Sequence, residues 1–211
     1  EWRRAEELAL PVCKRADLLG LLANSGRGVA VSGTHGKTTT SGMLALMLRE
    51  AGMDPTCILG GELTPLGGNA RNGSELVLVE ACEAYNSFLD LHPEAAIITN
   101  IEVDHLDFHG TAEHLYESFR RFLRQVRGFA VLNGDDPCVR EMTDLPPRAV
   151  TYGEGEGNTY LFDVIRLGDG PAFTLSRNGE MLGAFTLCVP GRHNISNAAG
   201  AAALALELGA E

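Results

Sequence analysis

Short, almost uninterrupted apolar runs recur along the chain. They lie at 29–32, 76–79, 95–99 and 129–132. A strand buried on both faces of a parallel sheet shows such a run, whereas a half-exposed strand alternates apolar and polar residues. We therefore predict a parallel strand at each of these four segments.

Helical periodicity follows several of the runs. After the first strand, apolar residues recur three and four apart, and Gly52 fits the end of that helix. Thr111 is a predicted N-cap, and the arginines of the helix that follows are interpreted as a solvated face. Small residues predict a last helix from Asn194 to Leu208. In the helix that follows the first strand, the apolar residues spaced three and four apart are Met43, Leu44, Met47, Leu48 and Ala51.

The pattern changes in two other places. Cys57–Leu59 is a short strand candidate, and the glycine-rich stretch after it, up to Gly73, is predicted to be a loop. From Ala149 onward, short β-prone segments separated by glycine turns predict an antiparallel patch. We thus expect one α/β domain: a mostly parallel sheet of the P-loop type flanked by helices, with a small antiparallel β annex. The segments of the patch are 159–166, 171–177 and 181–189.

Composition narrows the functional classes. The formal net charge of −11 disfavours non-specific binding to nucleic acid, which is itself a polyanion. No apolar run approaches the roughly 18 residues of a membrane helix, and no signal-peptide core is present. The five cysteines are scattered without a Cys-x-x-Cys pair, which predicts free thiols and a reducing cytoplasm.

The most informative segment joins the first strand to the first periodic helix. Gly33-Thr-His-Gly-Lys-Thr-Thr has the layout of a phosphate-binding loop, in which backbone N–H groups and a helix N-terminus face an anion. Lys37 is one of two lysines in the chain, the other being Lys14. We predict that the loop binds ATP or another nucleoside triphosphate. The expected contacts are Gly33, Thr34, His35, Gly36, Lys37, Thr38 and Thr39.

Two further candidates follow other strands, at the edge of the sheet where ligands bind in open α/β folds. Glu80 ends one strand and, with the Thr38 hydroxyl, offers the hard oxygen ligands that Mg²⁺ prefers. His105 follows another strand and lies four residues before His109, with Asp104 and Asp107 nearby. That cluster leaves zinc as an alternative, which the missing His-Glu-x-x-His pattern and the unexplained phosphate loop disfavour.

Other nucleotide-binding classes fit less well. Gly26-Arg-Gly28 precedes a strand and lacks a third glycine, unlike a dinucleotide fingerprint. Neither lysine follows an asparagine, so the Asn-Lys-x-Asp element with which a GTPase reads guanine is absent. The loop also departs from the Walker A pattern, because two residues rather than four separate Gly33 from Gly36.

That shortened loop resembles the loop of the Mur ligases, ATP-dependent enzymes that form amide bonds in peptidoglycan synthesis. Three further blocks agree with this family in order and spacing. They are Glu80-Ala-Cys-Glu-Ala-Tyr-Asn-Ser-Phe-Leu, Thr99-Asn-Ile-Glu-Val-Asp-His and Gly191-Arg-His-Asn-Ile-Ser-Asn-Ala-Ala.

The resemblance implies roles for single residues. Lys37 would contact the β- and γ-phosphates, Thr38 and Glu80 would bind a first Mg²⁺, and His105 would help to hold a second metal. In this view Lys37, Glu80 and His105 are the catalytic residues. Asn197, Asn194 and the neighbouring His193 would lie by the adenine. The candidate residues on the substrate side are Asn69, Arg71 and Glu83.

The loop with Thr-His and the Glu-Ala-x-Glu block most resemble the alanine-adding branch of the family. That resemblance implies two steps: ATP converts the carboxylate of UDP-N-acetylmuramate to an acyl phosphate, and the amine of L-alanine then displaces phosphate. Cys82 stands where many relatives carry Asp, and no lysine follows Lys37 to serve as the modified metal ligand of other branches. A muropeptide-recycling ligase and a non-ligase P-loop module are the alternatives.

The resemblance also implies how the chain is divided. We expect residues 1–27 to be a lead-in from an N-terminal domain that is missing here, and residues 28–211 to be the central ATP-binding domain. The family has a further C-terminal domain for the amino acid, for which this chain has no room. We therefore expect the chain alone to lack ligase turnover.

Overall fold

The computed structural model describes residues 2–103, 106–143 and 145–211, with the backbone alone at 106 and 107. The strands are β1 (Arg27–Ser32), β2 (Thr56–Leu63), β3 (Gly68–Arg71), β4 (Leu76–Ala81), β5 (Ala95–Ile98), β6 (Phe129–Asn133), β7 (Arg148–Gly153), β8 (Tyr160–Arg166), β9 (Ala172–Arg177) and β10 (Glu180–Thr186). The α-helices are α1 (Trp2–Glu7), α2 (Arg15–Asn24), α3 (Lys37–Glu50), α4 (Leu106–His109), α5 (Ala112–Gln125), α6 (Pro137–Arg140) and α7 (Arg192–Glu207). Two 3₁₀ segments are η1 (Thr64–Leu66) and η2 (Ala84–Asp90).

The strands form one sheet, in the order β10-β9-β8-β7-β6-β5-β1-β4-β2-β3. β1 pairs in parallel with β4 on one side and with β5 on the other. The chain fills one half of the sheet before it crosses to the other half, so the carboxyl end of β1 lies at a switch point in strand order. In open α/β sheets this position is where ligands bind.

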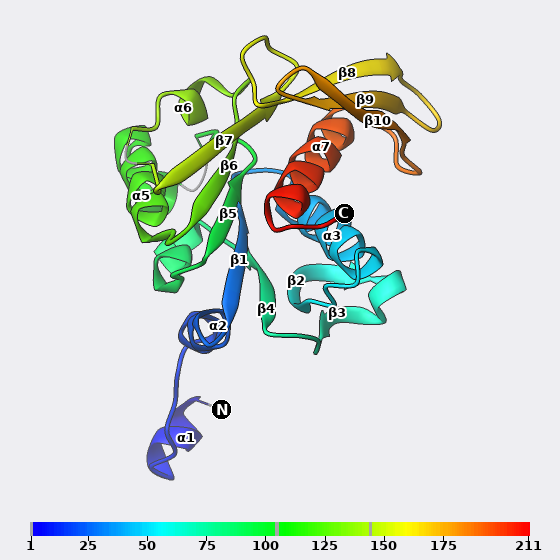
Figure 1. The fold of residues 1–211 in the computed structure, drawn as a ribbon. Helices are drawn as coiled ribbons and strands as arrows, with labels where there is room; N and C mark the ends of the chain where they lie inside the picture. The colour runs from blue at the N-terminus through cyan, green and yellow to red at the C-terminus, as the bar shows by residue number, and fades with distance from the viewer. Residues whose placement is uncertain (1, 104–105, 144) are drawn as a thin grey trace.

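Helices cover both faces of the central strands, which explains the apolar runs. Figure 1 shows α3 and α7 on one side of the sheet and α5 on the other. Val29 and Val31 of β1 belong to the core beneath α3 and α7, whereas Ala30 between them belongs to the core beneath α2 and α5. All three side chains are fully buried. The strands and helices predicted in this region are confirmed, including the N-cap at Thr111, whose Oγ1 accepts a hydrogen bond from His114 N.

The predicted loop from Gly60 to Gly73 is wrong in part. β2 continues to Leu63 and pairs with the antiparallel edge strand β3. Two glycines that read as loop residues lie inside β2, because neighbours come close there. A Cβ on Gly60 would lie 2.5 Å from Glu80 Oε2, and one on Gly61 would lie 3.1 Å from Thr38 Cγ2. Glycine thus permits close approach here instead of making a turn.

The predicted antiparallel strands are confirmed, and they extend the main sheet. β8 joins β7 through the pairs Tyr152↔Tyr160 and Gly153↔Leu161, and β9 and β10 then pair antiparallel. Side chains also fasten this extension to α7. The Tyr160 hydroxyl donates to Glu207 Oε1 at 2.6 Å, at the last residue of α7.

Three further features concern the cysteines, the lengths of the helices and the N-terminal helix. All five cysteines are free, as predicted. Within the described part of the chain, no helix is both long enough and apolar enough to cross a membrane. The short helix α1 has no buried residue and lies apart from the sheet (Figure 1).

Candidate functional site

The phosphate-binding loop turns sharply between β1 and α3. Gly33 has φ +132° and Gly36 has φ +84°, which are backbone conformations that residues with a Cβ rarely adopt. A Cβ would lie 2.1 Å from Thr99 Oγ1 at Gly33 and 2.5 Å from Asn197 Oδ1 at Gly36. Both glycines are therefore needed for the backbone shape and for the close packing of their neighbours.

The start of α3 completes an anion-binding concavity. The helix begins at Lys37, directly after Gly36. Its first N–H groups, from Lys37 to Thr39, have no acceptor within the helix, and the helix dipole places partial positive charge at the same end. This end of α3 can therefore bind phosphate oxygens.

Asn100 holds the part of the loop between Gly33 and Gly36. Its side-chain Oδ1 accepts from His35 N at 2.8 Å, and its Nδ2 donates to His35 O at 3.0 Å. Its backbone O accepts from Thr34 N at 3.0 Å. The amides of Thr34 and His35 are thus already bonded to protein and shape the loop from behind. Sequence reasoning missed this role, although Asn100 lies within the block that carried the family resemblance.

Lys37 folds back over the loop. Its Nζ donates to Gly33 O at 2.6 Å and to Thr34 O at 3.1 Å. It also lies 2.9 Å from Glu83 Oε2, and the two side chains are 17% and 1% exposed. The ammonium group is therefore held at the mouth of the loop, beside a buried carboxylate.

Thr38 and Glu80, the pair predicted to bind magnesium, lie together. Thr38 Oγ1 donates to Glu80 Oε2 at 3.0 Å, and Glu80 Oε1 accepts from Gly60 N at 2.6 Å. A hydroxyl and an oriented carboxylate are the hard oxygen ligands that suit Mg²⁺, which usually takes one or two such ligands from protein. The residues present therefore fit a magnesium–nucleotide complex.

The start of α7 flanks the loop and brings the two predicted asparagines to it. Asn197 is buried, and its amide lies against Gly36. Asn197 Nδ2 donates to Asn194 Oδ1 at 3.3 Å, and Asn194 Nδ2 donates to Pro190 O at 2.7 Å. These bonds orient both amides at the side of the phosphate loop.

Two of the residues predicted on the substrate side lie on the edge strand β3. Asn69 is exposed on β3. Arg71 forms an ion pair with Asp54 at 2.6 Å, near the start of β2, whereas Glu80 lies by the later part of that strand. His105 lies outside the described residues, so its metal role stays a prediction.

The zinc alternative falls largely in the same segment, because Asp104 and His105 are both outside the described residues. Elsewhere in the described chain, no group of three His, Cys, Asp or Glu side chains is placed to hold a metal. The structure therefore adds no support for zinc.

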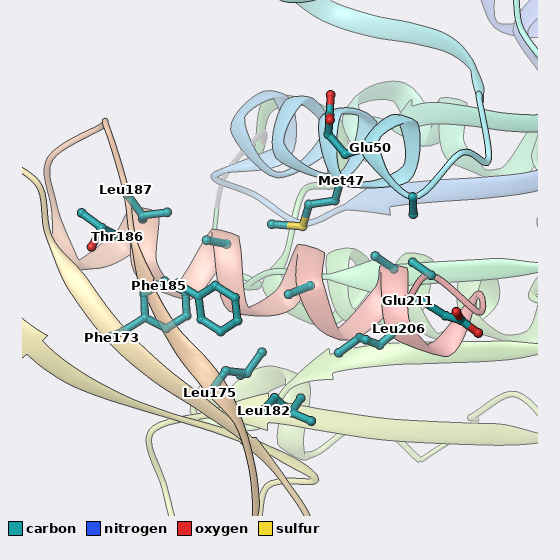
Figure 2. Close-up of a pocket in the computed structure, with 15 residues that line it drawn as sticks. Met47, Glu50, Phe173, Leu175, Leu182, Phe185, Thr186, Leu187, Leu206 and Glu211 are labelled. Atoms are coloured by element: carbon teal, nitrogen blue, oxygen red, sulfur yellow. The ribbon is translucent and has the colours of Figure 1, made fainter.

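A separate apolar groove of about 610 Å³ lies between α3, α7 and the β9–β10 hairpin. Figure 2 shows Met47 of α3, Phe173 and Phe185 of the hairpin and Leu206 of α7 facing it. Among the described residues that line it, the charged side chains are carboxylates. A groove of this kind does not suit a nucleotide phosphate, so the loop remains the candidate site.

Known proteins resemble this chain in sequence. Residues 31–205 match the Mur ligase middle domain. A UDP-N-acetylmuramate–L-alanine ligase from Syntrophomonas wolfei is 44% identical over 220 aligned positions, which cover 100% of this chain and 47% of the relative. The enzyme of the same name from Pelotomaculum thermopropionicum is also 44% identical, over 95% of this chain and 45% of the relative. The chain thus spans about half the length of these relatives.

Solved structures agree in fold. UDP-N-acetylmuramate–alanine ligase from Thermotoga maritima matches with a TM-score of 0.83 and 30% identity, over 98% of this chain and 47% of that protein. UDP-N-acetylmuramate:L-alanyl-gamma-D-glutamyl-meso-diaminopimelate ligase from Neisseria meningitides also matches with a TM-score of 0.83. Its identity is 25%, and the match covers 98% of this chain and 69% of that protein. From the shortened loop, the surrounding geometry and these matches, we conclude that the chain belongs to the Mur ligase family and corresponds to its middle domain.

Proposed function

We propose that this chain is the ATP-binding central domain of a ligase that joins L-alanine to UDP-N-acetylmuramate. The observation that carries the proposal is the phosphate loop with Lys37 at its mouth and the Thr38–Glu80 pair beside it. The relatives from Syntrophomonas wolfei and Pelotomaculum thermopropionicum are named for this reaction, and each shares 44% of aligned residues with the chain.

The chemistry requires activation of a carboxylate. At neutral pH a carboxylate and an amine form a salt and no amide, so transfer of a phosphoryl group from ATP must first provide a leaving group. Catalysis of such a transfer depends mainly on positioning and charge neutralisation. Lys37 and the first N–H groups of α3 would neutralise the phosphates, and Thr38 and Glu80 would hold Mg²⁺. His105 would help to bind a second metal.

The proposal includes the division of the chain and its surroundings. Residues 1–27 would lead in from a preceding domain, and residues 28–211 would form the nucleotide-binding unit. Asn194 and Asn197 would lie beside the adenine. The reaction would take place in the cytoplasm, without nucleic acid or membrane partners.

A muropeptide-recycling ligase is the second candidate within the family. The Neisseria structure is named for joining a peptide to the same muramate and has an equal TM-score. Its identity to this chain is 25%, against 30% for the Thermotoga alanine ligase. These values favour the alanine-adding enzyme. The match over residues 31–205 argues against a P-loop module unrelated to ligases.

Titration of Mg-ATP into the 211-residue chain tests the nucleotide site. We expect Lys37→Ala to weaken binding by about 100-fold, since a charge-assisted hydrogen bond contributes roughly 1.5–3 kcal/mol. Lys14→Ala removes the chain's other lysine, which is exposed at the start of α2, and should leave the affinity unchanged. Equal affinities of wild type and Lys37→Ala would refute the assignment.

Ligation is tested by ADP release and amide formation with UDP-N-acetylmuramate and L-alanine. We expect the 211-residue chain to bind nucleotide without forming amide, because it spans about half of its relatives. The chain joined to the flanking sequence should form the amide and lose this activity on Lys37→Ala. Amide formation with a peptide but not with L-alanine would instead support the recycling enzyme.

A further inference from the structure

Resting on the proposed function, we propose that Glu83 is a specificity-determining residue that makes the loop select magnesium-bound over metal-free nucleotide. Its carboxylate holds the lysine that the triphosphate needs. Any nucleotide must therefore compete with Glu83 for Lys37. The Glu83 charge repels free ATP more strongly than Mg-ATP, because the metal neutralises much of the nucleotide's charge.

The geometry places Glu83 where it can compete. Both oxygens of its carboxylate lie within hydrogen-bond distance of Lys37 Nζ, at 2.9 and 3.2 Å. The same ammonium donates to the backbone oxygens of Gly33 and Thr34. An ammonium has three protons, so these contacts together use its whole donor capacity. A phosphate oxygen can bind Lys37 only by taking the place of one of these acceptors.

Burial gives this competition its weight. The Glu83 side chain is 1% exposed and that of Lys37 is 17% exposed. Charges at such sites are screened much less than charges on the surface. A buried carboxylate next to the loop therefore repels a nucleotide in proportion to the nucleotide's own negative charge, which Mg²⁺ reduces by two.

A second carboxylate shows why Glu83 is distinct. Glu80 lies on the same edge, but it contacts the Thr38 hydroxyl and the Gly60 amide. Glu83 lies on the lysine. The two acids thus have different roles. Glu80 lies beside the Thr38 hydroxyl, where Mg²⁺ would bind, and Glu83 repels a nucleotide that arrives without metal.

The test compares two dissociation constants for each variant of the 211-residue chain: that of ATP in EDTA and that of ATP with excess Mg²⁺. We expect Glu83→Gln to tighten metal-free binding and to change Mg-ATP binding little, so the ratio of the two constants falls about tenfold or more. If Glu83 had a purely structural role, Glu83→Gln would raise both dissociation constants by the same factor and leave their ratio unchanged.

Two variants serve as controls. Glu102→Gln removes a carboxylate that also lies beside the loop, 3.5 Å from His35 Nε2, but is 65% exposed. Its ratio should match that of wild type. Glu83→Asp keeps the charge and should restore most of the selectivity. An unchanged ratio in Glu83→Gln, or an equal fall in Glu102→Gln, would overturn the inference.

The scarcity of lysine provides a readout that does not depend on the variant's stability. Lysine-labelled wild-type chain should show two side-chain NMR signals, and Lys14→Arg assigns them. Metal-free inorganic triphosphate should move the Lys37 signal only at concentrations well above those of its magnesium complex. Equal concentrations for both would overturn the inference. Failure of wild type to bind Mg-ATP at all would overturn the proposed function and the inference with it.

Discussion

Glycine has two separate uses in this molecule, and single positions distinguish them. At Gly36 the backbone is left-handed and a Cβ would collide with the amide of Asn197. At Gly52, after α3, φ is +76° but no atom beyond its chain neighbours lies within 4 Å of such a Cβ. Gly36 therefore serves both conformation and close packing, whereas Gly52 serves conformation alone.

Alanine at these two positions should measure the difference. We expect Gly52→Ala to lower the free energy of unfolding by roughly 1–2 kcal/mol through left-handed strain. Gly36→Ala should lose a further ~1–3 kcal/mol from overpacking against Asn197. Urea unfolding measures both, and Asn197→Ala should recover part of the Gly36→Ala loss but none of the Gly52→Ala loss. Equal losses at the two positions would contradict this account.

Among the elements, β1 and β5 are joined at their amino ends by a charged pair. The Arg27 guanidinium donates to the Glu94 carboxylate at 2.8 and 2.9 Å, just before β5 begins. Glu94 N also donates to Gly28 O at 2.8 Å. The hydrogen bond from Arg27 lowers the pKa of Glu94 below its ordinary value. The pair therefore aligns the two strands that lead to the phosphate loop and to Asn100.

This pair should make stability depend on pH. A lowered pKa in the folded state means that the contribution is fully present above the unfolded pKa of about 4.3 and is lost as pH falls through the folded value. Glu94→Gln should lower the free energy of unfolding at pH 7 by at most about 1 kcal/mol, because the pair is partly exposed.

Urea unfolding of wild type and Glu94→Gln from pH 7 to pH 2.5 should show the deficit vanish at the acid end. Glu180→Gln, at an exposed position on β10, is the matched control and should show no such convergence. A deficit that stays constant over the whole range would mean that the Arg27 contact does not set the pKa of Glu94.

At the scale of the molecule, α7 joins the phosphate loop to the antiparallel extension of the sheet. Its start flanks the phosphate loop at Asn197, and its last residue, Glu207, is 1% exposed beneath the antiparallel extension. Glu207 accepts from the Tyr160 hydroxyl and from Arg177, each at 2.6 Å, and also pairs with Arg148. One helix therefore connects the candidate nucleotide site with β7, β8 and β9.

Removing Glu207 should uncouple the extension from the rest of the sheet. We expect wild type to unfold in one transition, and Glu207→Ala to lose about 2 kcal/mol, because buried hydrogen bonds to a charged group are lost while both arginines can reach water. Hydrogen exchange should then be faster in β8–β10 than in β1 and β5. Glu207→Gln keeps hydrogen-bonding capacity, so its free energy of unfolding should lie between those of wild type and Glu207→Ala. Uniform exchange in Glu207→Ala would argue that α7 does not provide the coupling.

Local pattern was sufficient for much of the fold. The central strands and the helices at 37–50, 112–125 and 192–207 follow from apolar runs, helical periodicity and caps, which are properties of neighbouring residues. The β2–β3 hairpin did not follow, because Gly60 and Gly61 are explained by side chains of β4 and α3. Glycine in a sequence does not reveal whether it makes a turn or admits a neighbour.

For the site, the loop and the meeting of Lys37, Thr38 and Glu80 at one edge of the sheet could be predicted, because strand ends and glycine spacing are visible in the chain. The order of the sheet then decided which distant groups meet them. Glu83 reaches Lys37 across 46 residues and Asn100 reaches His35 across 65. Such pairings depend on which strands are neighbours, and no local period encodes that. The chain's own pattern therefore determined where a candidate phosphate site lies, while tertiary packing decided which groups hold its lysine and support its loop.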